Sequence, residues 1–361
     1  MRRAVLLGIA LLVGCGPLVL GDEHALGPLP AQPQTVPVDQ REARVELGRL
    51  LFWDPILSGD RDVACASCHH PDLGYADGRA RGLGTGAHGL GPLRTAPLGV
   101  ETLPLNTPTV LDTAYNGLAH LDDAIVPEEA PMFWDSRTRS LEAQAEGPLL
   151  AASEMRGSLR EDEVFDELSA RLSAIDEYSM RFEQAYGSVG IDRARIVSAI
   201  AAFERTLVIE DSSFDRFLAG DDAALSLPAR RGLVTFFAAG CASCHSGPML
   251  SDYELHDLGV GAIDPATGER QRIRTPSLRS AALTAPYMHD GSVATLEGAV
   301  SFYTGLDASL DPDLAGNRPL GPGSAADIAR FLESLGDGTF DTQIPDAVPS
   351  GLAVGGAIDS D

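Results

Sequence analysis

The chain has 361 residues, with 52 Asp and Glu against 27 Lys and Arg, and a formal net charge of −25 at pH 7. Such a charge repels nucleic acid and anionic lipid surfaces, so neither is expected as a partner. The length favours two domains, and an apolar content of 44% is sufficient for packed cores.

The first 15 residues have the pattern of a targeting segment. Two arginines precede an apolar stretch at residues 4–13 that is too short to span a bilayer as a mature helix. Leu-Val-Gly-Cys at residues 12–15 resembles a bacterial lipoprotein signal, which predicts lipidation of Cys15 and a periplasmic or cell-envelope location. The alternative is an ordinary cleaved signal with an incidental cysteine. Membrane contact is expected only through Cys15.

Residues 16–38 are rich in Pro and Gly and predict a tether. A helix is expected over residues 39–52, with Asp39 as its N-cap and Gly48 and Phe52 on its apolar face. The Gly-rich residues 74–99 predict an ordered loop around a cofactor.

The same pentapeptide, Cys-Ala-Ser-Cys-His, occurs at residues 65–69 and 241–245. C-x-x-C-H is typical of covalent c-type haem attachment, in which two thiols bond to the vinyl groups and the adjacent His binds iron. The sequence therefore predicts two covalent c-type haems. The predicted attachment residues are Cys65, Cys68, Cys241 and Cys244, and the predicted iron ligands are His69 and His245.

Zinc binding and local disulfides are the alternative interpretations of these cysteines. A zinc ribbon needs two C-x-x-C pairs about 15–20 residues apart, whereas these pairs lie in different halves of the chain. Disulfides would leave His69 and His245 unexplained.

A second helix is expected from Pro228 into the second pentapeptide, with Gly232 and Phe236 on one face. G-x-x-x-F thus precedes both pentapeptides, which indicates an internal repeat and two cytochrome-c-like units. Further helices are expected over residues 140–146, 161–172, 192–207, 295–303 and 325–335.

The expected fold is mainly α, with two cytochrome-c-like haem domains whose long loops enclose haem. The predicted boundaries are 39–210 for the N-terminal haem domain and 211–336 for the C-terminal haem domain. A link is expected over residues 210–222 and a loosely held tail over residues 337–361.

Several longer motifs resemble the bacterial dihaem cytochrome c peroxidase family, which includes peroxide-reducing enzymes and the MauG and MbnH type that oxidises aromatic residues of a partner protein. With both pentapeptides, the resemblance runs from about residue 45 to 335. The other motifs lie at residues 133–137, 140–145, 147–148, 154–155, 275–279 and 285–292.

The resemblance implies roles for three residues around the first haem. Glu154 and Gln144 would flank the peroxide, the carboxylate moving a proton between its oxygens and the amide orienting it. Trp134 would carry electrons between the haems. Without the resemblance, Glu154 would be interpreted as a surface residue and Trp134 as a core residue.

A calcium ion between the domains is also implied, held by Asn106 and the carbonyls of Thr284 and Pro286; oxygen-only ligation suits Ca²⁺. Asn106 alone is equally consistent with a turn. His88 occupies the place of the removable ligand of the first haem, flanked by Gly86 and Gly89, but the segment after it is longer than in the peroxidases.

Tyr303 lies fourteen residues after His289, where the peroxidases have Met and MauG-type enzymes have an axial Tyr. A phenolate ligand should lower the potential of the second haem. The alternatives are that Tyr303 packs on a helix face and that Met288 binds iron.

The resemblance predicts an exported oxidoreductase of the cytochrome-c-peroxidase type. It would reduce hydrogen peroxide with electrons from a small c-type cytochrome or another redox protein. A MauG-like oxidase of a partner protein and a non-enzymatic dihaem electron carrier are the alternatives. Family members are commonly dimers, so the resemblance also suggests a homodimer.

Overall fold

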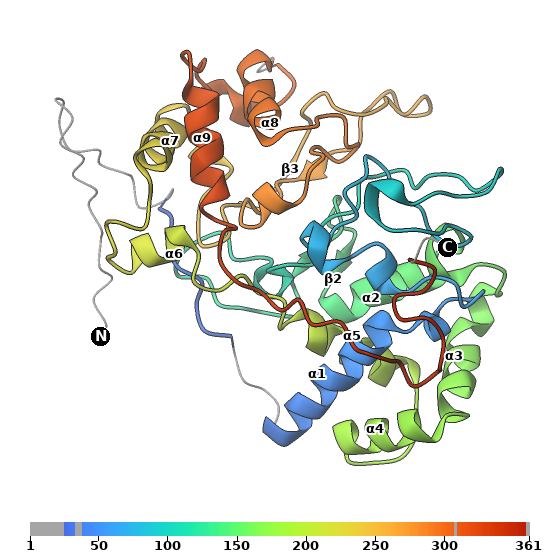
Figure 1. Ribbon diagram of the computed structural model, residues 1–361. Coiled ribbons are helices and arrows are strands. Elements are labelled where there is room, and N and C mark those ends of the chain that lie inside the picture. The colour runs from blue at the N-terminus through green and yellow to red at the C-terminus, as the bar shows by residue number, and fades with distance from the viewer. Residues whose placement is uncertain (1–24, 33–37, 307–308, 359–361) are drawn as a thin grey trace.

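The computed structural model describes residues 25–32, 38–306 and 309–358, and these are predominantly helical (Figure 1). The sheet content is small: β1 (Pro131–Met132) pairs antiparallel with β2 (Thr138–Arg139), and β3 (Leu255–His256) pairs antiparallel with β4 (Ile273–Arg274). The mainly α fold class is therefore confirmed. Within the described ranges, every helix is too short or too polar to cross a membrane. Cys15 lies outside these ranges, so its lipidation stays a prediction.

A first group of helices surrounds the first pentapeptide. Its members are α1 (Val38–Trp53), α2 (Leu141–Leu150), α3 (Val164–Ser173), α4 (Asp176–Tyr186) and α5 (Arg193–Glu204). Helix α1 packs directly on α5, because Gly48 has no side chain at the crossing: a Cβ there would lie 1.9 Å from the Ala199 carbonyl oxygen. Phe52, one turn later, meets Phe203 edge-on at 5.2 Å between ring centroids.

The second group repeats this crossing. Its members are α6 (Ser213–Leu218), α7 (Leu227–Ala238), α8 (Leu296–Phe302) and α9 (Ser324–Glu333). Helix α7 packs on α9, where a Cβ at Gly232 would lie 1.9 Å from the Asp327 carbonyl oxygen. Phe236 meets Phe331 edge-on at 5.4 Å. The G-x-x-x-F repeat therefore builds the same helix contact twice.

Each predicted helix is present, with shifted ends. Ser140, Ser226 and Thr295 cap α2, α7 and α8 through their hydroxyl groups, and Asp192 caps α5 through its carboxylate. Two helices were not predicted. Helix α4 was missed entirely, and α6 lies within the stretch that was interpreted as a link.

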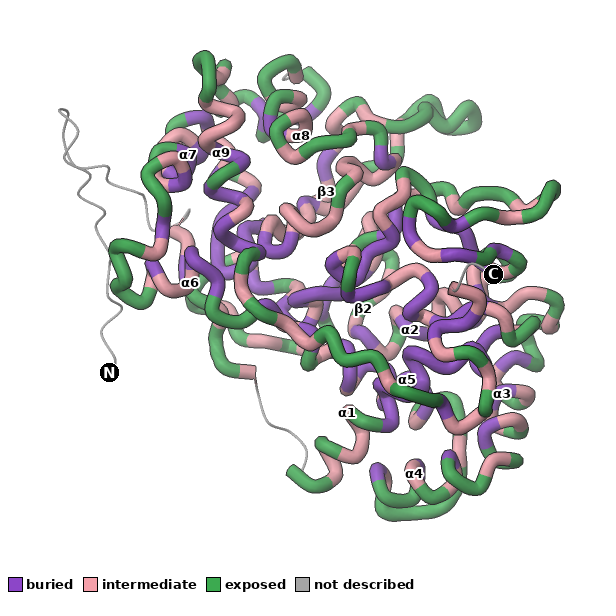
Figure 2. Tube along the Cα trace, viewed as in Figure 1, coloured by how far each residue is buried: buried purple, intermediate pink, exposed green. Residues whose placement is uncertain are grey.

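The prediction of a loosely held tail is wrong for residues 337–358, which run back across the first helix group (Figure 1). Asp341 pairs with the buried Arg49 of α1, and the Ser350 hydroxyl donates to Asp54 at 2.7 Å. The Gly355 amide donates to the Trp53 carbonyl at 2.7 Å. The tail is ordered because it pairs with charged and polar groups buried beneath it. Figure 2 shows that the cores of both helix groups are buried.

Candidate functional site

Two large cavities lie in the molecule, one at each pentapeptide. Cys65, Cys68 and His69 line the first cavity, and the second is lined by the corresponding residues 241, 244 and 245. The four cysteines are not joined by disulfides. Because the two C-x-x-C pairs line separate cavities, they do not form one zinc site.

The two motif histidines are held in the same way. The Nδ1 atom of His69 lies 2.9 Å from the Tyr75 carbonyl oxygen, and Nδ1 of His245 lies 2.9 Å from the Leu250 carbonyl oxygen. Nδ1 therefore carries the proton, and Nε2 is left to bind a metal. Burial lowers the pKa of both imidazoles, which keeps them neutral, as an iron ligand must be. With two thiols beside each histidine, both cavities fit a covalently bound haem.

Gln144 and Glu154 line the first cavity together with His69. Gln144 lies on α2, and Glu154 lies on the single π turn Ala152–Arg156 that follows it. The Gly-rich loop supports that turn from outside. A Cβ at Gly84 would lie 2.0 Å from the Ser153 carbonyl oxygen, and the Thr85 amide donates to the Glu154 carbonyl at 2.9 Å. The predicted pair is thus brought to the first cavity by one continuous segment.

Glu154 is half-buried, and burial raises the pKa of its carboxyl group, while the positive charge of Arg137 lowers it. The Arg137 guanidinium stacks on the Phe133 ring at 3.6 Å from the centroid and pairs with Asp135 at 2.8 Å. A carboxyl group with a raised pKa is suited to accept and return a proton near neutral pH.

Trp134 lines both cavities. It lies in the turn between β1 and β2, where its indole Nε1 donates to the Asn106 carbonyl at 2.8 Å. Its own carbonyl accepts from the Arg274 amide at 2.7 Å, which ties the turn to β4. The first bond fixes the indole and the second fixes the backbone of the turn, while the role of Trp134 as an electron bridge stays a prediction.

Asn106 and Pro286 are brought together. The Asn106 amide nitrogen lies 3.5 Å from the Pro286 carbonyl oxygen, and the Asn106 backbone amide donates to the His289 carbonyl at 2.8 Å. Thr284 lines the second cavity with both residues. The oxygen and nitrogen of an amide side chain are exchanged by a simple rotation, so this arrangement is compatible with calcium, which stays a prediction.

Tyr303 follows α8 and lines the second cavity with His245. Burial, and then Cys244 and Cys241, which line the same cavity, raise the pKa of its phenol. Met288 lines the same cavity. Both candidates for the second iron are therefore at the correct cavity.

His88 is not brought to the first cavity. It is exposed, its Nε2 lies 3.0 Å from the Thr95 hydroxyl, and its backbone exchanges two hydrogen bonds with Thr95, each 2.8 Å long. The neighbouring Arg94, only 1% exposed, donates to the carbonyls of Leu83 and Gly89 at 3.1 Å each. The loop is thus closed on itself, and the exposed imidazole is not among the residues that line the first cavity.

Two functional candidates at the cavities were missed. Glu204 lines the first cavity, and His256 lines the second. Glu204 continues the buried helical face of Ile196 and Ile200 at a spacing of four residues, which was a visible signal in the sequence.

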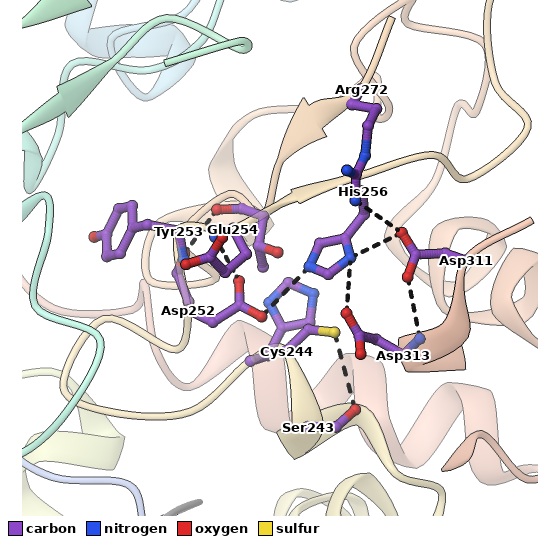
Figure 3. Close-up of polar contacts among 12 residues, drawn as sticks. Ser243, Cys244, Asp252, Tyr253, Glu254, His256, Arg272, Asp311 and Asp313 are labelled. Carbon is purple, nitrogen blue, oxygen red and sulfur yellow. Dashed lines mark hydrogen bonds and ion pairs between the residues drawn. The ribbon is translucent and has the colours of Figure 1, made fainter. Parts of the chain in front are cut away.

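His256 is the centre of a charged cluster (Figure 3). Its Nδ1 lies 3.1 Å from Asp311, and its Nε2 lies 3.4 Å from Asp252. The Asp252 carboxylate, and then Cys244, raise the pKa of His256 to about 11, so the imidazole is a cation. Arg272 lies 3.5 Å from the same Asp311 carboxylate.

Comparison with known proteins gives one consistent result. The family model for di-haem cytochrome c peroxidase matches residues 42–223. The methylamine utilization protein MauG of Methylorubrum extorquens is 36% identical, over 81% of this chain and 78% of its own length. The cytochrome c551 peroxidase of Nitrosomonas europaea is 31% identical, over 89% of this chain and 88% of its own length.

A solved structure agrees with these relatives. The crystal structure of a MauG-like protein associated with microbial copper homeostasis superposes with a TM-score of 0.67 at 27% identity, covering 90% of this chain and 96% of that one. The family implies two haems, which matches the two pentapeptide cavities. The chain belongs to the di-haem cytochrome c peroxidase family.

Proposed function

We propose that this protein is an exported dihaem enzyme that reduces hydrogen peroxide to water with electrons from a small c-type cytochrome or a similar redox protein. One observation carries the proposal: a carboxyl group and an amide, Glu154 and Gln144, line the same cavity as His69. A pure electron carrier has no use for a proton-exchanging group beside its cofactor.

The bound haem would supply the iron at which the O–O bond of peroxide is reduced. Glu154 would take the proton from one peroxide oxygen and return it to the other, which then leaves as water. The Gln144 amide would orient the peroxide by hydrogen bonding. His69 would hold its imidazole fixed through Tyr75 while Nε2 faces the cavity.

Trp134 would be the electron route between the two haems, because its indole lines both cavities and is fixed at Nε1. Asn106, Thr284 and Pro286 would hold one calcium ion at the same junction. Lipidation at Cys15 would anchor the protein to the cell envelope, and a homodimer is proposed only on the analogy of the family.

A second candidate function is supported by two further positions. Tyr303 at the second cavity and the outward-facing His88 both favour a MauG-like enzyme, which would need no prior reduction and would use peroxide to oxidise an aromatic residue of a partner protein. In this version the electrons that reduce peroxide come from that partner through Trp134.

Mixing the fully oxidised, haem-loaded protein with peroxide tests these functions. A rapid and lasting change of the haem spectrum without prior reduction would support the MauG-like enzyme. A response only after one haem has been reduced would support a gated peroxidase, in which His88 closes the first iron until that reduction. His88 would then have to leave its contact with Thr95 to reach the iron.

An unchanged spectrum in both redox states would contradict both enzymatic functions and leave the electron carrier. A steady-state assay with a small reduced cytochrome c, following its oxidation by peroxide, then separates peroxide reduction from protein oxidation.

A further inference from the structure

Glu204 is a buried carboxyl group in the first cavity. The peroxide reaction proposed for Glu154 and Gln144 gives it no role. It ends α5, is 4% exposed and lines the cavity together with Glu154 and Gln144. Its Oε2 atom has no hydrogen-bond partner among the described residues. An unpaired buried carboxyl group destabilises the fold, so a functional reason for it is expected.

The charges around Glu204 leave it without a counter-ion of its own. Arg205 is committed to Glu142 of α2 by two bonds of 2.6 and 2.8 Å. On α1, Arg49 is committed to Asp341 of the tail. Burial raises the pKa of Glu204 to about 8, with Arg205 lowering it and Glu142 raising it. The group is therefore mostly protonated at neutral pH.

Glu204 lines the cavity and is followed in the chain by Arg205, which pairs with Glu142. The side chains of Glu142 and Arg205 are 34% and 26% exposed, so this pair is in contact with water. Helix α2, which packs on α5 (Figure 1), carries Glu142 towards that surface and Gln144 into the cavity. A proton taken up at the surface pair has a short way to Glu204 and from there to the cavity.

We propose that Glu204 is a proton carrier that delivers protons from solvent to the first cavity. This inference rests on the proposed peroxide chemistry. Reduction of H₂O₂ breaks the O–O bond and gives two H₂O, which consumes two electrons and two protons. Glu154 only moves the proton that peroxide already carries. The two electrons come from the redox partner, and the two protons must enter from outside; Glu204 gives up its proton to the cavity and is reprotonated past Glu142.

The test compares Glu204→Gln with the wild-type holoenzyme between pH 5 and 9. Gln keeps the size of the side chain but cannot release a proton, so peroxide turnover at pH 7 should fall by at least about tenfold, a moderate loss for one acid–base group. Wild-type turnover should decline as pH rises through about 8, where Glu204 loses its proton, and the variant should lack this decline. Glu204→Asp should recover part of the rate.

Infrared spectroscopy supplies a readout independent of turnover. The wild-type holoenzyme should show a protonated-carboxyl band that disappears near pH 8 and is missing in Glu204→Gln. Haem content and thermal midpoint establish that the variant has folded.

Asp112→Asn is the matched control. Asp112 is also buried, at 1% exposed, has an unpartnered Oδ2 and a pKa raised by burial to about 6, but it lines neither cavity. Its substitution should leave peroxide turnover unchanged. Equal rates and equal pH profiles for Glu204→Gln and wild type would overturn the proton-carrier role. A wild-type protein that does not react with peroxide would instead overturn the proposed function, and this role with it.

Discussion

The two cavities hold the Cys-Ala-Ser-Cys-His motif in the same way and differ in the other side chains that line them. Both have the same pentapeptide, the same backbone carbonyl bond to the histidine and the same glycine-dependent helix crossing. The first cavity adds Glu154, Gln144 and Glu204, whereas the second adds Tyr303 and the His256 cation. We therefore expect the repeated part of the chain to attach the cofactor and the unrepeated segments to determine its chemistry.

The largest effect is expected from substitutions that remove one haem-attachment motif at a time. Cys65→Ala with Cys68→Ala, or Cys241→Ala with Cys244→Ala, should each reduce the mass of the mature protein by one haem, because the thiols form the covalent bonds. Only the first pair of substitutions should abolish the spectral response to peroxide of protein that has been fully reduced beforehand. Mass spectrometry and absorption spectra measure both results. Equal loss of the peroxide response in the two variants would contradict the division of labour.

The next largest effect is expected from a single substitution in the first cavity. Glu154→Gln should keep both haems but reduce peroxide turnover by about 100-fold or more, because the neutral amide cannot accept the peroxide proton. The exposed Glu163→Gln is a matched control and should turn over normally. Near-normal turnover of Glu154→Gln would exclude its acid–base role.

The corresponding change in the second cavity is Tyr303→Met. If the phenolate binds iron, replacing it by a thioether should raise the reduction potential of the second haem and leave that of the first unchanged. Tyr287→Phe, which alters another tyrosine of the same cavity, should change neither potential. A redox titration followed by absorption gives both values, and identical spectra for Tyr303→Met and wild type would show that Tyr303 is not a ligand.

The smallest effect is expected at the helix crossing that both helix groups contain. Gly48→Ala and Gly232→Ala should each lower the free energy of unfolding by about 1–3 kcal/mol, because the added methyl group meets a backbone oxygen of the partner helix. Gly316→Ala, which has no atom within 4 Å of its Cβ position, should be nearly neutral. Denaturant unfolding measures the differences. Clearly unequal losses at Gly48 and Gly232 would mean that the two crossings are not equivalent.

Local patterns in the sequence predicted the two helices that carry G-x-x-x-F and marked both C-x-x-C-H motifs as candidate attachment sites. The repeated G-x-x-x-F and the capping residues act within a few positions, so they can be recognised without a structure. Helix α4 has its buried Tyr178, Phe182 and Ala185 at helical spacing and was predictable by the same rule. The roles of Glu154 and Tyr303 needed the family resemblance, because nothing near them in sequence indicates a cavity.

Other features depend on partners that are distant in sequence. The order of residues 337–358 follows from Arg49 and Asp54, which lie near the other end of the chain. The outward position of His88 follows from Thr95 and the buried Arg94, and neither has a local signature of such a role.

The contact of the tail with the first attachment turn has a consequence for the order of assembly. The Ser67 hydroxyl lies within that turn and donates to the Gly355 carbonyl at 2.7 Å, so its partner lies 288 residues further along the chain. A growing chain therefore holds its first pair of thiols without this bond until Gly355 has been added and the tail has folded back. We expect the first turn to reach its final structure only after the second motif has already been made.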